Sequence, residues 1–190
     1  MSGHDATSER LTFFIGVVCA VIGCLFFAAL CFGAVIATET SPDGLWRVDL
    51  DGRPDGHGTM YEVYSTPTIG GVRRKISGIL PSDYDVSDFL ISGDSARVVF
   101  RRGRTATGDW QLYSTPISVG VPVRLSLGMA YVEEQRFGGY SMHGRCVHFK
   151  GATAAGGALT NYAVPIAGGE VKPLLVFADG FESGGMGNWR

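Results

Sequence analysis

The sequence has almost no cysteine where a folded domain would need it for disulfides. Three of its four cysteines lie inside one apolar stretch, and only Cys146 lies in the remainder. A single thiol cannot form an internal disulfide. Exported domains without disulfides are common, so this shortage excludes only a disulfide-stabilised fold, and stability must come from packing.

Net charge is also nearly absent. The 190 residues include 16 basic and 18 acidic side chains, which gives a formal charge of -2. Such a chain has no long-range field that would attract a polyanion. We therefore expect no nucleic acid partner, and the charge indicates no other partner.

Catalytic motifs are missing as well. The sequence contains no Ser/His/Asp order, nucleophile elbow or phosphate-binding loop, and its Gly70-Gly71 and Gly168-Gly169 pairs are typical of turns. We expect neither catalysis nor a cofactor.

One long uncharged run is present, LTFFIGVVCAVIGCLFFAALCFGAVIA at residues 11–37. Its 27 residues exceed the roughly 20 that a membrane helix needs, so we predict a transmembrane segment after a short tail at 1–10. The small residues that end it also suit signal-peptidase cleavage before Thr38, and Cys24 fits a loose lipoprotein pattern. The first two alternatives both export residues 38–190, either anchored in the membrane or secreted after cleavage near Ala37.

The rest of the chain repeats itself. Shifting the sequence by 49 residues aligns three tyrosines, three prolines and three glycines, and it also aligns Ile76, Leu125 and Leu174. The matched positions are Tyr64, Tyr113 and Tyr162, then Pro67, Pro116 and Pro165, then Gly71, Gly120 and Gly169. Three copies at one offset indicate a structural repeat.

One period contains four strand patterns, at residues 84–92, 96–103, 110–118 and 122–127. Turn-forming residues separate them, so they suit antiparallel hairpins. A period of about 40 to 50 residues with four strands is typical of a β-propeller blade, which makes the expected fold class all-β.

We expect three repeats, at about 38–80, 81–128 and 129–176, followed by a tail at 177–190. In one interpretation, residues 33–40 at the end of the apolar segment form the opening strand of the first repeat. Cleavage after Ala37 would then cut that strand, so a complete first blade would require an uncleaved anchor. Known propellers use about 4 to 8 blades, so three do not close a ring. The chain would then be a fragment, a degenerate copy, or part of a homo-oligomer that completes the propeller.

Several of these segments resemble a known family. SPDG at 41–44, ISGDSARVVF at 91–100 and WQLYSTPISVGVPVRLS at 110–126 are similar to the repeat of TolB-type six-bladed propellers, which are WD40-like. The resemblance covers about residues 34–176, and it is eroded at Gly93 and at 141–144. It implies a bacterial envelope protein that contacts other proteins, because TolB-type propellers are envelope adaptors.

The C-terminus carries a second resemblance. VFADGFESGGMGNW at 176–189 is similar to a short tail, F-x-D-G-F-E-x-G followed by a tryptophan, at the ends of many exported bacterial proteins. We weigh an export or processing role for this tail against simple packing on the last blade.

The sequence offers few candidate ligand residues. His143, Cys146 and His148 are the only cluster of metal-ligand types, and a metal would need a further ligand from elsewhere, with His4 and His57 the only other histidines. We expect surface strand residues and no metal there.

Two further clusters favour hairpin loops over binding sites. Asp49, Asp51 and Asp55 lack the spacing of a calcium loop, so a hairpin loop is the preferred interpretation. Residues Arg101, Arg102 and Arg104 indicate a solvated basic hairpin tip.

The favoured function is an exported, membrane-tethered and non-catalytic binding module for a protein or envelope polymer. The alternatives are an accessory propeller of a prolyl-oligopeptidase-like peptidase whose catalytic domain lies outside this chain, or a truncated product without its own function.

Overall fold

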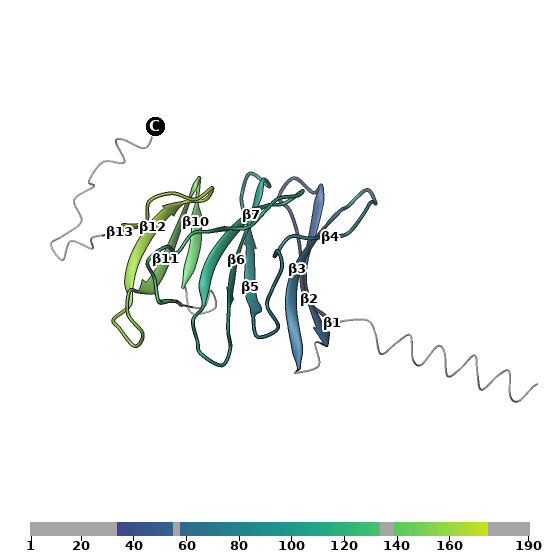
Figure 1. Cartoon of the computed structure of the whole chain (residues 1–190). Coiled ribbons are helices and arrows are strands. Elements are labelled where there is room, and N and C mark those ends of the chain that lie inside the picture. Colours follow the sequence, from purple (N-terminus) through teal and green to yellow (C-terminus); the bar gives the residue numbers. More distant parts are fainter. Residues whose placement is uncertain (1–33, 55–57, 134–138, 175–190) are drawn as a thin grey trace, which may run out of the picture.

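The computed structural model describes residues 34–54, 58–133 and 139–174, and the regular structure in these ranges is all β-strand (Figure 1). Three antiparallel sheets follow one another along the chain. Sheet A contains β1 (Ala34–Thr40), β2 (Trp46–Pro54), β3 (Thr59–Pro67) and β4 (Arg74–Lys75). Sheet B contains β5 (Asp85–Ile91), β6 (Arg97–Gly103), β7 (Gln111–Pro116) and β8 (Val123–Arg124). Sheet C contains β10 (Tyr140–His143), β11 (Cys146–Ala152), β12 (Thr160–Pro165) and β13 (Lys172–Pro173), and β9 (Tyr131–Val132) also pairs with β11.

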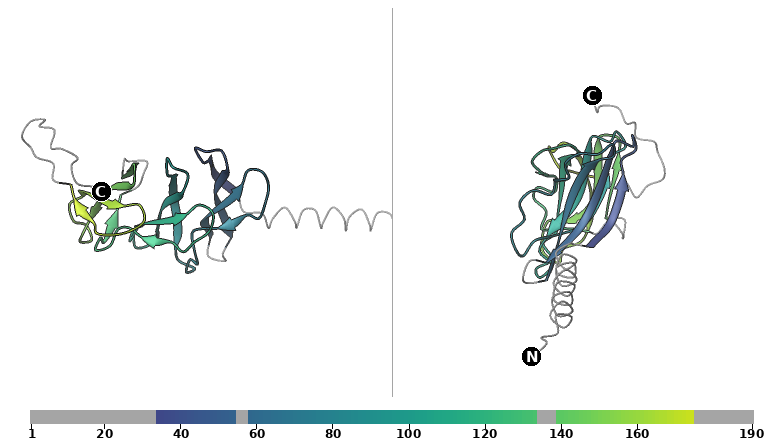
Figure 2. Two further views of the ribbon diagram at one scale, coloured as in Figure 1. Left: turned by 90° about the horizontal axis from the view of Figure 1, so that it is seen from above. Right: turned by 90° about the vertical axis from the view of Figure 1, so that its right-hand side faces the viewer.

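The three sheets stand face to face in a row, as the view from above shows (Figure 2). Successive side chains of a strand point to opposite faces of its sheet, so sheet B contributes to two cores. Val98 and Phe100 of β6 are buried against sheet A, whereas Val99 is buried against sheet C. Among the described residues, the middle sheet is therefore covered on both faces, and each outer sheet is covered on one face by its neighbour.

The repeated tyrosines and prolines occupy the third strand of each sheet. The tyrosines lie within β3, β7 and β12, and the prolines are the last residues of those strands. Two of the tyrosines stack on a phenylalanine of the neighbouring strand, with ring centroids 5.9 Å apart for Phe100 and Tyr113 and 5.5 Å for Phe149 and Tyr162. The tyrosine of sheet A instead lies under the guanidinium of Arg73, 3.8 Å from its ring centroid. The repeat thus marks equivalent places in three sheets.

The repeated glycines follow from the prolines. A β-carbon on the glycine four residues after each proline would meet the proline ring at 3.2 Å for Gly71, 2.6 Å for Gly120 and 3.3 Å for Gly169. The chain turns back over the proline at the end of the strand. A β-carbon would clash with the proline ring at Gly120, whereas Gly71 and Gly169 combine a tight approach with a φ of +148°, which other residues rarely adopt. This close approach gives the physical reason for the Pro-x-x-x-Gly spacing.

The expected elements and the observed ones agree within two residues in most places. The strands predicted at 84–92, 96–103, 110–118 and 122–127 correspond to β5, β6, β7 and β8, although β8 has only two residues. The opening strand expected at 33–40 is β1, so sheet A includes four residues before the repeat boundary at 38. The tail at 1–10, most of the apolar segment at 11–37 and the tail motif at 177–190 lie outside the described residues. Within the described ranges, no helix has the length and apolarity to cross a membrane.

The 49-residue shift does not hold everywhere. Facing pairs on the second and third strands are Asp49–Tyr64, Phe100–Tyr113 and Phe149–Tyr162, and the first pair is separated by two more residues than the others. The hairpin of sheet A is therefore longer. As a result Asp49, not Asp51, occupies the place of Phe100 in sheet B.

We expect Gly120→Ala to destabilise the fold by about 1 to 3 kcal/mol, because its β-carbon would lie 2.6 Å from the Pro116 ring, which cannot move aside easily. Gly93→Ala is the matched control, since nothing lies within 4 Å of its β-carbon, and it should change stability by less than about 1 kcal/mol. Urea unfolding followed by tryptophan fluorescence measures both. Equal effects of the two substitutions would contradict the packing explanation.

Candidate functional site

Two sets of connections meet at one end of the sheet stack, which we call the turn end (upper end in Figure 1). It comprises the tight turns between the first two strands of each sheet and the loops between the third and fourth strands. These are residues 41–45, 92–96 and 144–145, and residues 68–73, 117–122 and 166–171. Hydrogen bonds join the two sets, because the amide of Thr68 donates to the carbonyl of Leu45 (3.0 Å) and the amide of Ile117 to the carbonyl of Ala96 (3.0 Å).

A serine and an aspartate hold the first two turns in the same way. The Ser41 hydroxyl donates to Asp43 (2.5 Å) and accepts from the Trp46 amide (2.9 Å), and Ser92 does the same with Asp94 (2.6 Å) and Arg97 (2.9 Å). These serine hydrogen bonds hold the pKa of each aspartate below its usual range. Hydrogen bonds thus hold both turns in one conformation, which explains the similar motifs SPDG at 41–44 and SGDS at 92–95.

Five exposed aliphatic side chains lie in the turn-end connections of sheets A and B. Ile69 is 93% exposed and Val121 is 83% exposed, although both belong to apolar residue types. The complete set, which we call the aliphatic row, is Leu45, Ile69, Val72, Val119 and Val121. Large exposed apolar groups that gather on one side of a molecule are typical of contact surfaces, while single ones are not.

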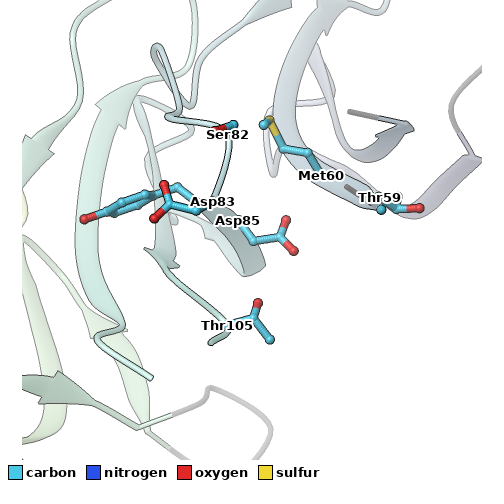
Figure 3. A pocket seen from close by; sticks show the side chains of 8 residues that line it. Thr59, Met60, Ser82, Asp83, Asp85 and Thr105 are labelled. Carbon is cyan, nitrogen blue, oxygen red and sulfur yellow. The ribbon is translucent and has the colours of Figure 1, made fainter. Parts of the chain in front are cut away.

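A small polar pocket lies between the ends of sheets A and B (Figure 3). Its volume is about 140 Å³, and Gly58, Thr59, Met60, Ser82, Asp83, Tyr84, Asp85 and Thr105 line it. Pockets for ordinary organic ligands measure about 300 to 1,000 Å³, so this one is too small for such a ligand.

The acidic groups around this pocket serve the local structure. Asp85 accepts hydrogen bonds from the amides of Tyr61 (2.5 Å) and Val86 (3.1 Å). Arg104 lies 3.6 Å from Asp83 and donates to Asp109 (2.9 Å). The pKa of Asp109 is lowered to about 2, and the hydrogen bonds that Arg104 donates to its carboxylate are the largest cause. These carboxylates therefore hold loops in position. Because the pocket is also too small for an ordinary ligand, the turn end is the better candidate site.

The structure brings two of the weak metal candidates together. The rings of His143 and His148 lie 4.8 Å apart, and Cys146 is the ladder partner of His143. Burial, followed by the neighbouring His143, lowers the pKa of His148. His4 and His57 lie outside the described residues, and within the described ranges no group of three or more metal-ligand side chains is found. The two histidines are therefore a side-chain pair across a hairpin.

Two expectations about loops are wrong. Asp49 and Asp51 do not lie in a hairpin loop but within β2, where they are 2% and 7% exposed, while Asp55 lies outside the described residues. Arg101 and Arg102 lie within β6, and only Arg104 belongs to the following loop.

Arg101 differs most from the expected solvated hairpin tip, because it is only 1% exposed. It donates to the Ser87 hydroxyl (2.9 Å) and to the Val132 carbonyl (3.1 Å), and its guanidinium lies over the Trp110 ring. The sequence does not show which of these arginines is buried, because neighbouring side chains of a strand point to opposite faces of its sheet.

An ion-pair network on the outer face of sheet A was not foreseen. Glu62 is 1% exposed and accepts from the Tyr64 hydroxyl (2.6 Å) and Lys75 (2.9 Å). Asp49 and Asp51 pair with Arg73 at 3.7 and 2.9 Å. Burial raises the pKa of Tyr64 to about 12, and the adjacent Glu62 adds to that shift. Within the described part of the chain no sheet packs on this face of sheet A, and the network covers it.

No family model and no curated protein matches the sequence. Solved structures do. One is described as a TolB from Agrobacterium tumefaciens: it is 22% identical with a TM-score of 0.51, over 77% of this chain and 50% of that one. A second is a puromycin-hydrolyzing peptidase of Mycobacterium tuberculosis, 16% identical with a TM-score of 0.51, over 73% of this chain and 20% of that one. A third is the β-propeller domain of the Trilobed protease from Pyrococcus furiosus, 13% identical with a TM-score of 0.53, over 80% of this chain and 46% of that one.

The described part of the chain is a partial β-propeller. This confirms the predicted all-β fold class and the resemblance to TolB-type repeats at the level of the fold. The chain spans half or less of each of these similar structures. The C-terminal tail resemblance and the completion of the ring by a second copy remain predictions.

We expect Glu62→Ala to destabilise the protein by about 2 kcal/mol, because Tyr64 and Lys75 lose a buried acceptor while partial exposure of the lysine limits the effect. Glu170→Ala is the control, since Glu170 pairs with Lys172 at the surface with its side chain 78% exposed, and it should cost less than about 0.5 kcal/mol. Thermal and urea unfolding compare the two variants. A Glu62 effect as small as that of Glu170 would show that the network does not stabilise the sheet.

Proposed function

We propose that the chain is a non-catalytic, TolB-like propeller module that binds a protein partner through the aliphatic row at its turn end. We further propose that the apolar run expected at 11–37 anchors it in the bacterial inner membrane through its residues before Ala34, because Ala34–Ala37 belong to strand β1. The sheets would then lie on the periplasmic side. The observation that carries the binding proposal is the exposure of the row, which reaches 93% at Ile69.

The chemistry of the row favours a protein over an envelope polymer. Its side chains are all aliphatic and offer no hydrogen-bonding group, whereas a sugar polymer is recognised largely through hydroxyls. Burial of these side chains against an apolar partner surface would contribute about 25 cal/mol for each Å² removed from water. Polysaccharide from the envelope is therefore the less favoured partner.

The loops that display the row are already ordered, which helps binding. The Gly70 amide donates to the Pro67 carbonyl (3.1 Å), and Thr68 donates through its hydroxyl to the Gly44 carbonyl (2.7 Å). A loop held in one conformation loses little conformational entropy when a partner docks. The turn end thus has both the apolar groups and the rigidity of a docking surface.

A second candidate is an accessory propeller that serves a peptidase. Two of the three similar structures come from peptidases, and one is a propeller domain of such a protein. In that case the partner at the turn end would be a catalytic domain outside this chain.

A photo-crosslinking residue placed at Ile69 should form a discrete adduct in bacterial cells that express the full chain. The same residue at Leu159, which is 44% exposed but lies in the loop between β11 and β12, should not. Adding Val121→Asp should reduce the Ile69 adduct about tenfold or more, because a charge would be desolvated in an apolar contact. Mass spectrometry of the adduct separates an adaptor partner from a peptidase domain, and equal labelling at both positions would refute the proposed site.

The mature protein should retain residues 1–37 and stay in the membrane fraction after carbonate washing. Cleavage before Thr38 would remove the first four residues of the seven-residue strand β1, which pairs along its length with β2. Intact mass and N-terminal sequencing of the protein from membranes measure this. A mature N-terminus at Thr38 in the soluble fraction would refute the anchor while leaving the binding proposal intact.

A further inference from the structure

The outer face of sheet C, which points away from sheet B, carries polar residues at positions that are apolar in the other sheets. Ladder pairing makes His148 equivalent to Val48 and Val99, because each pairs with the same place on the third strand. By the same criterion Asn161 replaces Val63 and Leu112, which are both fully buried. Sheet C therefore does not present the surface that sheets A and B present to the next sheet.

One apolar position of this face is left open. The amides of Ile76, Leu125 and Leu174 donate to equivalent carbonyls of the third strands, at 2.9, 2.8 and 2.8 Å. Ile76 is 1% exposed and Leu125 is 0% exposed, because the next sheet covers each of them, but Leu174 is 37% exposed. A cavity of about 170 Å³ lies beside it, lined by Ser141, His148, Phe149, Lys150, Asn161 and Leu174. Sheet C thus has a partly apolar hollow that none of the sheets in ranges 34–54, 58–133 and 139–174 covers.

A second copy stacked in the manner of a propeller would bring sheet A of one chain onto this face. In sheets B and C the surface that meets the preceding sheet contains Val98 and Phe100, or Val147 and Phe149. The equivalent residues of sheet A are Arg47 and Asp49, and its exposed groups include Arg53 and Lys75. These cations pair with Asp49 and Glu62, and burying the charged groups against the partly apolar hollow beside Leu174 would cost their desolvation, which disfavours this occupant.

We propose that the C-terminal segment of the chain, residues 175–190, covers the outer face of sheet C. The segment follows directly after Leu174. At the equivalent place in sheets A and B, the chain enters the interface with the next sheet. There the residue four positions after Ile76 is Leu80 and the one after Leu125 is Met129, both buried. The segment has apolar side chains for the hollow, namely Phe177, Phe181 and Trp189.

Charge and length also favour this segment. Its acidic residues Asp179 and Glu182 would extend the ion pairs that Lys150 and Lys172 make with Glu133 and Glu170, because the two lysine side chains are still 43% and 49% exposed. Sixteen residues can extend to roughly 50 Å, and a seven-residue strand such as β11 measures only about 23 Å. The segment is long enough to cross the face and return.

Amine acylation of the full chain, resolved by peptide mass spectrometry, tests the proposal. Phe177→Ser with Phe181→Ser should raise the acylation rate of Lys150 at least threefold and speed hydrogen exchange across β12. Ser183→Ala, a change in the same segment, should leave both unchanged. Lys75 on sheet A reports on the rest of the fold and should keep its rate in every variant.

A second variant protects the test against misfolding. Asp179→Lys with Glu182→Lys reverses the charge of the segment but keeps its aromatic side chains, and it should also raise the Lys150 rate without changing that of Lys75. Unchanged Lys150 acylation in both double variants would overturn the proposal. So would a Lys150 rate in the native chain that falls with protein concentration alongside dimer formation, because a second copy would then be the occupant.

Discussion

Face-to-face stacking of twisted sheets is the constraint on which the rest of this structure depends. A four-stranded sheet buries an apolar face only when another layer covers it, and in this protein that layer is a neighbouring sheet. In sheet B the alternation along β6 sends Val98 and Phe100 toward one neighbour and Val99 toward the other, so two cores share one strand. The connections between strands are then confined to the two ends of the stack, which is why loops from all three sheets gather at the turn end (Figure 1).

The same constraint explains the two outermost faces. Arg47 and Asp49 take the places that valine and phenylalanine occupy in sheets B and C, and buried Glu62 gathers cations around it. At the opposite side of the stack His148, Lys150 and Asn161 replace residues that are buried in sheet A or B. Repeat proteins need polar outer faces on their terminal repeats to stay in solution, and the outer face of sheet A follows this rule, whereas that of sheet C also keeps the exposed Leu174 beside its polar groups.

The repeated Tyr-x-x-Pro and the glycine four residues after its proline predicted the three sheets, because these residues depend on interactions within a few positions of the chain. A proline ends the third strand, and a glycine passes over its ring four residues later in each sheet. Arg101 and Asp49 were misplaced for the opposite reason. Runs of arginine and aspartate usually indicate a solvated loop, but these two lie in strand interiors, where Ser87 and Val132 satisfy the first and Thr38 donates to the second (2.9 Å). Those partners are distant in the sequence, so no local pattern reports them.

By itself the sequence determined the fold class, the number of repeats and the strands within each, because hydrophobic alternation and turn residues act over a few positions. It also predicted strand positions for His143, Cys146 and His148. Only the tertiary structure decided which polar residues are buried, which aliphatic residues protrude at the turn end, and that Leu174 lies open where Ile76 and Leu125 are covered. Exposure of a repeated position depends on whether another sheet stands against it, and that is a property of the stack rather than of the repeat.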